Sequence, residues 1–377
     1  MKTRIFFIII FFLLLSYSFG NFAIASSVQV YDVFSNFIDN INASHTQNNE
    51  QISFTSPKNI KSIYLTADTM ASKIGPQLID KLIESGGNAV VIDIEHGGGV
   101  LAFTPKTSLL KELNPGRPTL DKMPSLIKEL HKKGIYVIAR QVVFNDPYVG
   151  LRKPEWRIKN KWGGLYDYRW LDPSKSGVQI YNLYMMKEVA EMGFDEIQFD
   201  YIRFPAAYHK SLDYYYDEEK FSRADIIIDF LKKARRLADL YNIKLSVDVF
   251  GAIVWGDIDW QIVGQDPSRI AEIVDVIYPM TYPSHVSPGY NGFKNPWGDP
   301  YSFVKGSIER FVKSANGRAE IRTWIQGFPL KAPHFGTWYI EAQIKASFDA
   351  GATGYAIWSP GNHYGYSWPA MEYNPAQ

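Results

Sequence analysis

From Ile60 onward the sequence repeats one local pattern, in which a short run of β-branched and aromatic residues is followed by a loop and then by a stretch with helical apolar spacing. Eight such runs occur, near residues 62, 88, 135, 195, 243, 274, 322 and 354. Strands that alternate with helices pair in parallel through right-handed crossovers, and eight units in about 300 residues is the count of a closed barrel. We therefore predict one α/β domain, a (β/α)8 TIM barrel, over residues 58–377.

The ends of the helical stretches support this fold. Several of them stop at a glycine, which readily adopts the left-handed backbone of a helix C-cap. These glycines are Gly86, Gly134, Gly193, Gly317 and Gly351. An open, doubly wound sheet is the alternative. It is less favoured because neither a G-x-G-x-x-G turn nor a lysine-containing phosphate loop follows the first run, which also argues against nucleotide binding.

The first 57 residues depart from the repeated pattern. Lys2 and Arg4 precede an apolar run over residues 5–15, and Ala23-Ile24-Ala25 follows, which is typical of a secretory signal peptide with its cleavage site. We predict a signal peptide over residues 1–25, a polar leader over 26–57, and an exported protein that is extracellular, periplasmic or attached to the cell envelope. No stable membrane span is expected after cleavage, and an uncleaved N-terminal anchor is the alternative.

Charge and composition limit the partners that this chain is expected to bind. Forty Lys and Arg against 39 Asp and Glu give a formal charge of +1, so no broad basic surface is expected to recruit nucleic acid. There is no cysteine, and the seven histidines lack the H-x-H or H-x-x-x-H spacing of a metal site, so neither a metal nor another cofactor is predicted. The many aromatic residues could stack on sugar rings or pack in the core.

The fourth run, in the stretch GFDEIQFDYIRFP, alternates polar and apolar residues over positions 195–203. In a closed barrel, successive side chains point in turn to the lumen and to the surrounding helices. The expected helix-facing set is Ile197, Phe199 and Tyr201, and the expected lumen-facing set is Glu196, Gln198 and Asp200. The fifth run repeats this pattern, with Ser246 and Asp248 inward.

Asp200 and Asp248 lie near the C-terminal ends of the fourth and fifth runs, where barrels of this type carry their catalytic groups. Adjacent strands are about 4.8 Å apart, so the two carboxylates are expected to lie within several ångströms of each other, as two-carboxylate glycoside cleavage requires. We predict Asp200 as nucleophile or charge stabiliser and Asp248 as general acid or base, with roles that can be exchanged. Alternatively, the interior acids form a neutralised buried network with Arg140.

Eight further residues are predicted to bind the substrate: Asp93, Arg140, Arg203, Tyr278, Tyr282, His285, Gln326 and Trp358. Arg203 could hold a carboxylate or a sugar hydroxyl, or else pair with a loop acid such as Asp213. The aromatic residues of the sixth run could contact sugar at the rim or simply pack there. Trp324 and Trp358, at the ends of the last two runs, form either a floor beneath a sugar ring or a plug in the barrel.

Several segments in order resemble the bacterial "putative glycosyl hydrolase" barrel family, a group of exported proteins. The segments are ARQVVFNDP, KPEW, GFDEIQFDYIRFP, VDVFG, GQD, YPMTYPSHVSPG, WIQGF and AIWSPGN. The resemblance runs from residue 60 to the end and implies a glycoside-hydrolase-like barrel, with Asp200 at the position of the family's fourth-strand aspartate. The family's second strand resembles V-D-V-K, whereas this chain has Ile92-Asp93-Ile94-Glu95, so no family role is assigned to Glu95.

We therefore predict an exported glycoside hydrolase that acts on a polysaccharide or cell-wall glycan. The chief alternative is a non-catalytic carbohydrate-binding or envelope barrel, and an esterase or amidase on the same fold is a third class. The chitinase signature D-G-x-D-x-D-x-E does not fit, because its terminal glutamate, the proton donor, would fall on Ile202. The sequence predicts no oligomeric state.

Overall fold

The computed structural model describes residues 37–38, 56–160, 162, 164, 166–206 and 212–373. The chain divides into two compact units, residues 1–51 and 52–377. Of the first unit, only residues 37 and 38 are described, and both are helical. The predicted signal peptide lies outside the described residues, as does most of the predicted leader, so both stay predictions. Within the described ranges, every helix is too short or too polar to span a membrane.

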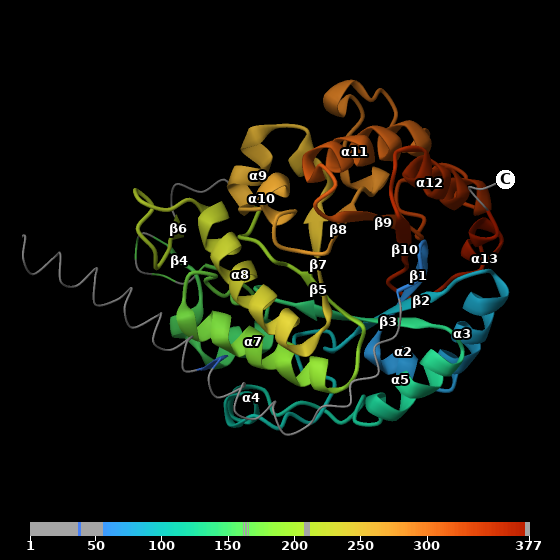
Figure 1. Ribbon diagram of the computed structural model, residues 1–377. Coiled ribbons are helices and arrows are strands. Elements are labelled where there is room, and N and C mark those ends of the chain that lie inside the picture. Colours follow the sequence, from blue (N-terminus) through green and yellow to red (C-terminus); the bar gives the residue numbers. More distant parts are fainter. Residues whose placement is uncertain are drawn as a thin grey trace, which may run out of the picture. The chain divides into compact units, whose positions relative to one another are not determined.

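Eight parallel strands close into a barrel, which confirms the predicted (β/α)8 architecture (Figure 1). In chain order they are β1 (Ile60–Leu65), β2 (Ala89–Asp93), β3 (Tyr136–Val142), β5 (Glu196–Asp200), β7 (Lys244–Phe250), β8 (Val276–Met280), β9 (Glu320–Gln326) and β10 (Gly354–Trp358). The last strand, β10, pairs with the first, β1. This closure excludes the open, doubly wound sheet.

Helices surround the ring of strands, as Figure 1 shows. The helices predicted from apolar spacing are α3 (Ile74–Glu84), α5 (Met123–Lys132), α7 (Ser176–Glu191), α8 (Arg223–Tyr241), α11 (Pro300–Ala315) and α12 (Thr337–Asp349). Shorter helices are α2 (Ala67–Ala71), α4 (Ser108–Leu113), α6 (Pro147–Arg152), α9 (Asp257–Val263), α10 (Pro267–Ile270) and α13 (Ser367–Met371). All five glycines that were predicted to end helices have positive φ angles, between 74° and 95°.

Short elements occupy the loops after the strands. The two-residue strands β4 (Lys159–Asn160) and β6 (Leu212–Asp213) pair antiparallel and join the loop after β3 to the loop after β5. The part of the chain that the structure describes contains four 3-10 turns: η1 (Pro154–Trp156), η2 (Gly251–Val254), η3 (Pro283–His285) and η4 (Tyr290–Gly292). Of these, η2 directly follows β7 and η3 begins three residues after the end of β8, so both lie at the same end of the barrel as the predicted site.

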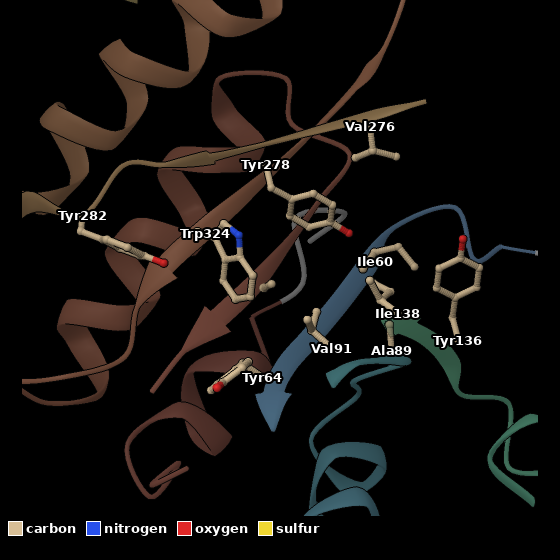
Figure 2. Close-up of a cluster of buried hydrophobic side chains, with 11 residues drawn as sticks. Ile60, Tyr64, Ala89, Val91, Tyr136, Ile138, Val276, Tyr278, Tyr282 and Trp324 are labelled. Atoms are coloured by element: carbon tan, nitrogen blue, oxygen red, sulfur yellow. The ribbon is translucent and has the colours of Figure 1, made fainter. Parts of the chain in front are cut away.

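The alternation along the strands places apolar side chains on both sides of the barrel wall. Ile197 and Phe199 are fully buried, and the ring of Phe199 lies 5.7 Å from that of Phe230 on α8, as predicted for the helix-facing side. Inside, one buried cluster draws on β1, β2, β3, β8, β9 and β10. Figure 2 shows Tyr64, Trp324 and Tyr282 toward one end of this cluster and Tyr136 at the other. The interior of the barrel is therefore filled with packed side chains and is not an open channel.

A buried ion pair crosses this packed interior. Arg322 is fully buried and donates to Glu196 (2.9 Å) and to the hydroxyl of Tyr278 (3.1 Å). Glu196 also accepts from the hydroxyl of Tyr136 (3.1 Å). The lumen-facing position predicted for Glu196 is thereby confirmed. A buried carboxylate is unfavourable without a partner, and Glu196 finds its partners on other strands. The resulting network links β3, β5, β8 and β9 beneath the site.

Candidate active site

A cavity of about 370 Å³ lies at the C-terminal ends of the strands. Its lining includes the final residues of β5, β7, β8 and β10, which is the end of the barrel where catalytic groups are expected. The predicted site residues in the lining are Arg140, Asp200, Arg203, Asp248, Tyr282, His285 and Trp358. The other lining residues are Tyr201, Phe250, Gly251, Ala252, Met280, Val286, Phe303 and Trp324.

Asp200, the last residue of β5, is held from two sides. Arg140 on β3 donates to its Oδ2 through Nε (3.2 Å) and Nη2 (2.5 Å). The backbone N–H of Tyr201 donates to Oδ1 (2.6 Å). These contacts fix the carboxylate in one orientation, and 9% of the side chain remains exposed at the cavity wall.

Asp248 on β7 lies beside Asp200. The strand register pairs Phe199 with Val247, so the next step along both strands brings the two aspartates together. Oδ1 of Asp248 accepts a hydrogen bond from Nε1 of Trp324 (2.7 Å), whereas Oδ2 has no hydrogen-bond partner among the described residues. Burial, followed by the nearby charge of Asp200, raises the pKa of Asp248 well above its usual range.

Arg140 connects three interior carboxylates. Besides its bonds to Asp200, it donates through Nη1 to Asp93 (2.6 Å), and its Nε lies 3.9 Å from Oδ2 of Asp248. Asp93 also accepts a hydrogen bond from the hydroxyl of Tyr64 on β1. Asp93 does not line the cavity. Asp93 therefore holds the side chain of Arg140 in place. The geometry does not support the predicted contact between Asp93 and substrate.

Arg203 has different surroundings, although it lines the same cavity. Its guanidinium carbon lies 4.1 Å from the ring centre of Phe250, 4.8 Å from that of Trp170 and 5.1 Å from that of Tyr201. It donates one hydrogen bond, from Nη1 to the backbone carbonyl of Phe204 (3.0 Å), and forms no ion pair with a carboxylate of the described residues. Burial lowers the pKa of Arg203 to about 10. The side chain of Asp213, its predicted alternative partner, lies outside the described part.

Aromatic rings form the wall on the side of β8, β9 and β10. Trp358 lies 4.0 Å from the ring of Tyr64 and 5.6 Å from that of Trp324, which it meets at 90°. The ring of Tyr282 lies 5.2 Å from that of His285. Burial, and then the charge of Lys331, lower the pKa of His285 below its usual value. This wall therefore offers ring faces and a histidine whose neutral form is favoured.

Besides Asp93, two further residues predicted to bind substrate lie outside the cavity lining. Tyr278 is fully buried within the interior cluster, and its hydroxyl accepts from Arg322 below the site. Gln326 is also fully buried, and its amide nitrogen donates to the carbonyls of Phe328 (3.0 Å) and Leu330 (2.9 Å). Its carbonyl oxygen accepts from the N–H of Ser284 (3.0 Å). Gln326 thus ties the η3 turn to the loop after β9, and the geometry does not support substrate contact by either side chain.

Tyr201 was predicted to face the helices with Ile197 and Phe199, and this prediction is wrong. Strand β5 ends at Asp200, and Tyr201 has a φ of 53°, so the backbone turns and the tyrosine lines the cavity. Two-residue alternation applies only while the chain remains extended. Trp324 was predicted to be either a floor beneath a sugar ring or a plug in the barrel. It belongs to the interior cluster and also lines the cavity, so its position fits both interpretations.

A second pair of buried acids lies outside the cavity lining. Glu95 accepts from the N–H of Val142 (2.8 Å), and Asp146 caps α6 by accepting from the N–H of Val149 (2.9 Å). Their other oxygens have no hydrogen-bond partner among the described residues. Burial raises the pKa of Asp146 to about 7, and burial followed by the charge of Asp146 raises that of Glu95 well above its usual range.

Within the described ranges, no three His, Cys, Asp or Glu side chains form a group that could hold a metal ion.

Comparisons with known proteins place this geometry in context. The family described as "putative glycosyl hydrolase domain" matches residues 62–364. No curated protein matches the sequence significantly. A hypothetical protein of known structure from Ruminiclostridium thermocellum is 33% identical, with a TM-score of 0.44, and the match covers 50% of this chain and 97% of that chain.

Two solved glycoside hydrolases resemble the barrel as a whole. The glycoside hydrolase domain of PgaB (BpsB) from Bordetella bronchiseptica is 15% identical, with a TM-score of 0.61 over 83% of this chain and 98% of that chain. A β-galactosidase from the psychrophilic Marinomonas ef1 is 12% identical, with a TM-score of 0.57 over 83% of this chain and 58% of that chain. At these identities the likeness shows the fold alone.

Proposed function

Because the chain belongs to the "putative glycosyl hydrolase domain" family, we propose that it is a glycoside hydrolase whose catalytic groups are Asp200 and Asp248. One observation carries the proposal, namely two carboxylates on adjacent strands at the wall of one cavity, in unlike surroundings. Asp200 is ion-paired with Arg140, whereas the pKa of Asp248 is raised by burial. Two acids whose surroundings separate their protonation states can act as acid and as nucleophile or base.

The contacts of Asp248 support its role as the proton donor. The indole N–H of Trp324 is a donor only, so Oδ1 of Asp248 must act as the acceptor in that bond. The proton of neutral Asp248 then resides on Oδ2, which has no hydrogen-bond partner among the described residues. Passing this proton to the leaving oxygen of a glycoside requires that Oδ2, which is buried in this structure, become accessible when substrate binds. Asp200 would attack the anomeric carbon, stabilise its positive charge or activate water.

The proposed substrate is a polysaccharide or cell-wall glycan outside the cytoplasm. The rings of Tyr282, Trp324 and Trp358 line the cavity, and aromatic faces pack well on the apolar faces of sugars. Export is supported by the charged and apolar pattern of residues 1–25.

A second candidate function is a carbohydrate-binding barrel without catalysis. The observation that favours it is the network in which Arg140 pairs with both Asp93 and Asp200. Such a network can neutralise interior acids for structural reasons alone. It would leave the aromatic wall able to hold a glycan, while the two aspartates perform no chemistry.

Activity measurements separate the two candidates. The protein is incubated with a panel of polysaccharides, and new reducing ends are measured for wild type, Asp200→Asn and Asp248→Asn. We expect wild type to cleave at least one glycan and each variant to lose activity by about 10²- to 10⁴-fold. Asp146→Asn is the matched control, since Asp146 is also a buried acid with a raised pKa but does not line the cavity, and it should retain activity.

The pH profile is a second readout of the same proposal. Because Asp248 must be protonated to act, wild-type kcat should fall as the pH rises through its raised pKa. Binding of glycans without release of reducing ends by wild type, across the whole panel, would instead support the non-catalytic barrel.

A further inference from the structure

The cavity contains two arginines whose charges are compensated to different degrees. Arg140 forms ion pairs with Asp93 and Asp200, so its charge is taken up within the protein. Arg203 makes one hydrogen bond, to the carbonyl of Phe204, and has no carboxylate partner among the described residues. Of the two, Arg203 is therefore the one without a carboxylate in direct contact, although the charge of Asp200 acts on it from a longer distance.

Arg203 is nonetheless held firmly in place. Three rings, from Phe250, Trp170 and Tyr201, lie within 5.1 Å of its guanidinium carbon. Only 7% of the residue is exposed, and it contributes to the cavity lining. A guanidinium has five N–H donors in a planar fork, and Phe204 occupies one of them. The remaining donors have their orientation fixed by the rings before any ligand binds.

The direct contacts around the cavity leave Arg203 available to an anion. Asp248 is buried with a raised pKa, and Asp200 and Asp93 are both engaged by Arg140. The charge of Asp200 acts on Arg203 only from a distance, so the N–H groups of Arg203 that do not bond Phe204 remain able to donate to a ligand. A neutral hydroxyl could accept one hydrogen bond from Arg203, whereas the two oxygens of an anionic group can accept two parallel ones, which are stronger because they are charge-assisted.

We propose that Arg203 binds an anionic substituent of the glycan, so that the substrate of this cavity is an acidic polysaccharide. The proposal rests on the proposed function and names its class of substrate. A planar guanidinium pairs with a carboxylate or a sulfate through two parallel hydrogen bonds, and the aromatic rings present Arg203 in a fixed plane for such a pair. The anion is supplied either by the carboxylate of a uronic acid or by a sulfate ester.

Binding is tested in the Asp248→Asn background, which blocks turnover and replaces a buried acid by a neutral amide of the same shape. The probes are oligosaccharides of uronic acids, the same oligosaccharides after reduction of their carboxyl groups, and sulfated and unsulfated galactan oligosaccharides. Calorimetric titration should show tighter binding of one anionic probe than of its neutral counterpart. The uronic acid and sulfate arms identify which anion is recognised.

Substitution of Arg203 should abolish that preference. Arg203→Gln is expected to weaken binding of the anionic probe by about 10- to 100-fold while leaving the neutral probe almost unchanged. Arg203→Lys keeps the charge without the planar fork and should bind the anionic probe with an intermediate affinity. This variant also provides the test if Arg203→Gln folds poorly. Arg310→Gln is the matched control, because Arg310 also lies over an aromatic ring, that of Trp255, and donates to a backbone carbonyl away from the cavity.

The outcomes for the two proposals are distinguishable. No preference for any anionic probe, or equal weakening of both probes by Arg203→Gln, would overturn the inference even if wild type cleaves neutral glycans. Conversely, binding of acidic probes through Arg203 without cleavage by wild type would leave this inference standing and refute the hydrolase.

Discussion

The buried aspartates take different properties from their surroundings. Asp200 accepts from two N–H groups of Arg140 and from the N–H of Tyr201. Among the described residues, Asp248 accepts only from the indole N–H of Trp324, and Asp146 accepts from the N–H of Val149 in the first turn of α6. All three are nearly or fully shielded from solvent. Burial disfavours the charged form of a carboxyl group unless hydrogen bonds or a cation offset it. For Asp248 and Asp146, the few hydrogen bonds that each accepts do not offset burial, so the pKa of each is raised.

Asp146 gives a residue-scale prediction about stability and pH. Its pKa is about 7 in the folded protein, above the ordinary value of 3.8, so the folded state binds this proton more tightly than the unfolded state. The resulting stabilisation is fully present below about pH 4 and is lost as the pH rises to about 7. The side chain in Asp146→Asn has no proton to lose, so the stability of the variant does not depend on this titration. The free energy of unfolding of the wild type should therefore fall relative to that of the variant across this pH window, by up to about 4 kcal/mol.

Urea unfolding of both proteins between about pH 4 and pH 8 measures this effect. Asparagine keeps the helix cap, because its side-chain oxygen can still accept from Val149. A difference in the free energy of unfolding that stays constant across the pH range would contradict the prediction.

At the scale of elements, the end of β5 determines the shape of the site. Tyr201 has a φ of 53°, a left-handed conformation that is unfavourable for a residue with a Cβ atom. The turn directs the N–H of Tyr201 to Asp200, while its carbonyl accepts from the N–H of Phe144 (3.3 Å). Strain of this kind persists where the surrounding structure holds it, and it is often found at functional sites.

This strain predicts an inverted order of stability between two variants. Tyr201→Gly and Tyr201→Ala both lose the aromatic ring, so their difference reports on the backbone. Alanine normally stabilises relative to glycine, but here glycine should be the more stable by about 1 kcal/mol, because it adopts a positive φ without steric conflict. Urea unfolding measures both, and a more stable Tyr201→Ala would show that the left-handed turn is not maintained in solution.

The elements were largely predictable from the sequence, whereas parts of the site were not. Strands and helices follow from periodicity and from glycines at helix ends, and both depend on local sequence. Asp200 and Asp248 could be expected to meet because parallel strands in a barrel have their ends in common. The positions of Tyr278 and Gln326 could not be predicted, because they depend on how deep each residue lies in the barrel and on which loop its side chain binds. The turn at Tyr201 could not be predicted either, because the alternation of polar and apolar residues does not show where a strand ends.

At the scale of the whole molecule, the interior ion pair is predicted to determine stability rather than activity. Arg322 and Glu196 are both completely buried. Arg322→Met leaves a buried carboxylate without its cation and should lower the free energy of unfolding by about 3–5 kcal/mol. The double variant Arg322→Met with Glu196→Leu should recover much of this loss, because both charges are then absent.

An exposed pair offers the matched comparison. Arg318 and Glu272 form an ion pair with side chains that are 38% and 58% exposed. Arg318→Met should change the free energy of unfolding by less than about 1 kcal/mol. Denaturant unfolding of the three variants checks the prediction, and an equal effect at the two arginines would argue against a dominant role of the interior pair.

The closure of the barrel by β1 and β10 has a consequence for the order of biosynthesis. Trp358 ends the last strand, yet it stacks on Tyr64 of the first and lies 5.0 Å from the guanidinium of Arg140 on the third. A nascent polypeptide that has not yet been translated as far as Trp358 lacks one wall of the pocket, however much of the remainder has already folded. The proposed glycan-cleaving site is therefore incomplete until the final strand has been made and has closed the barrel.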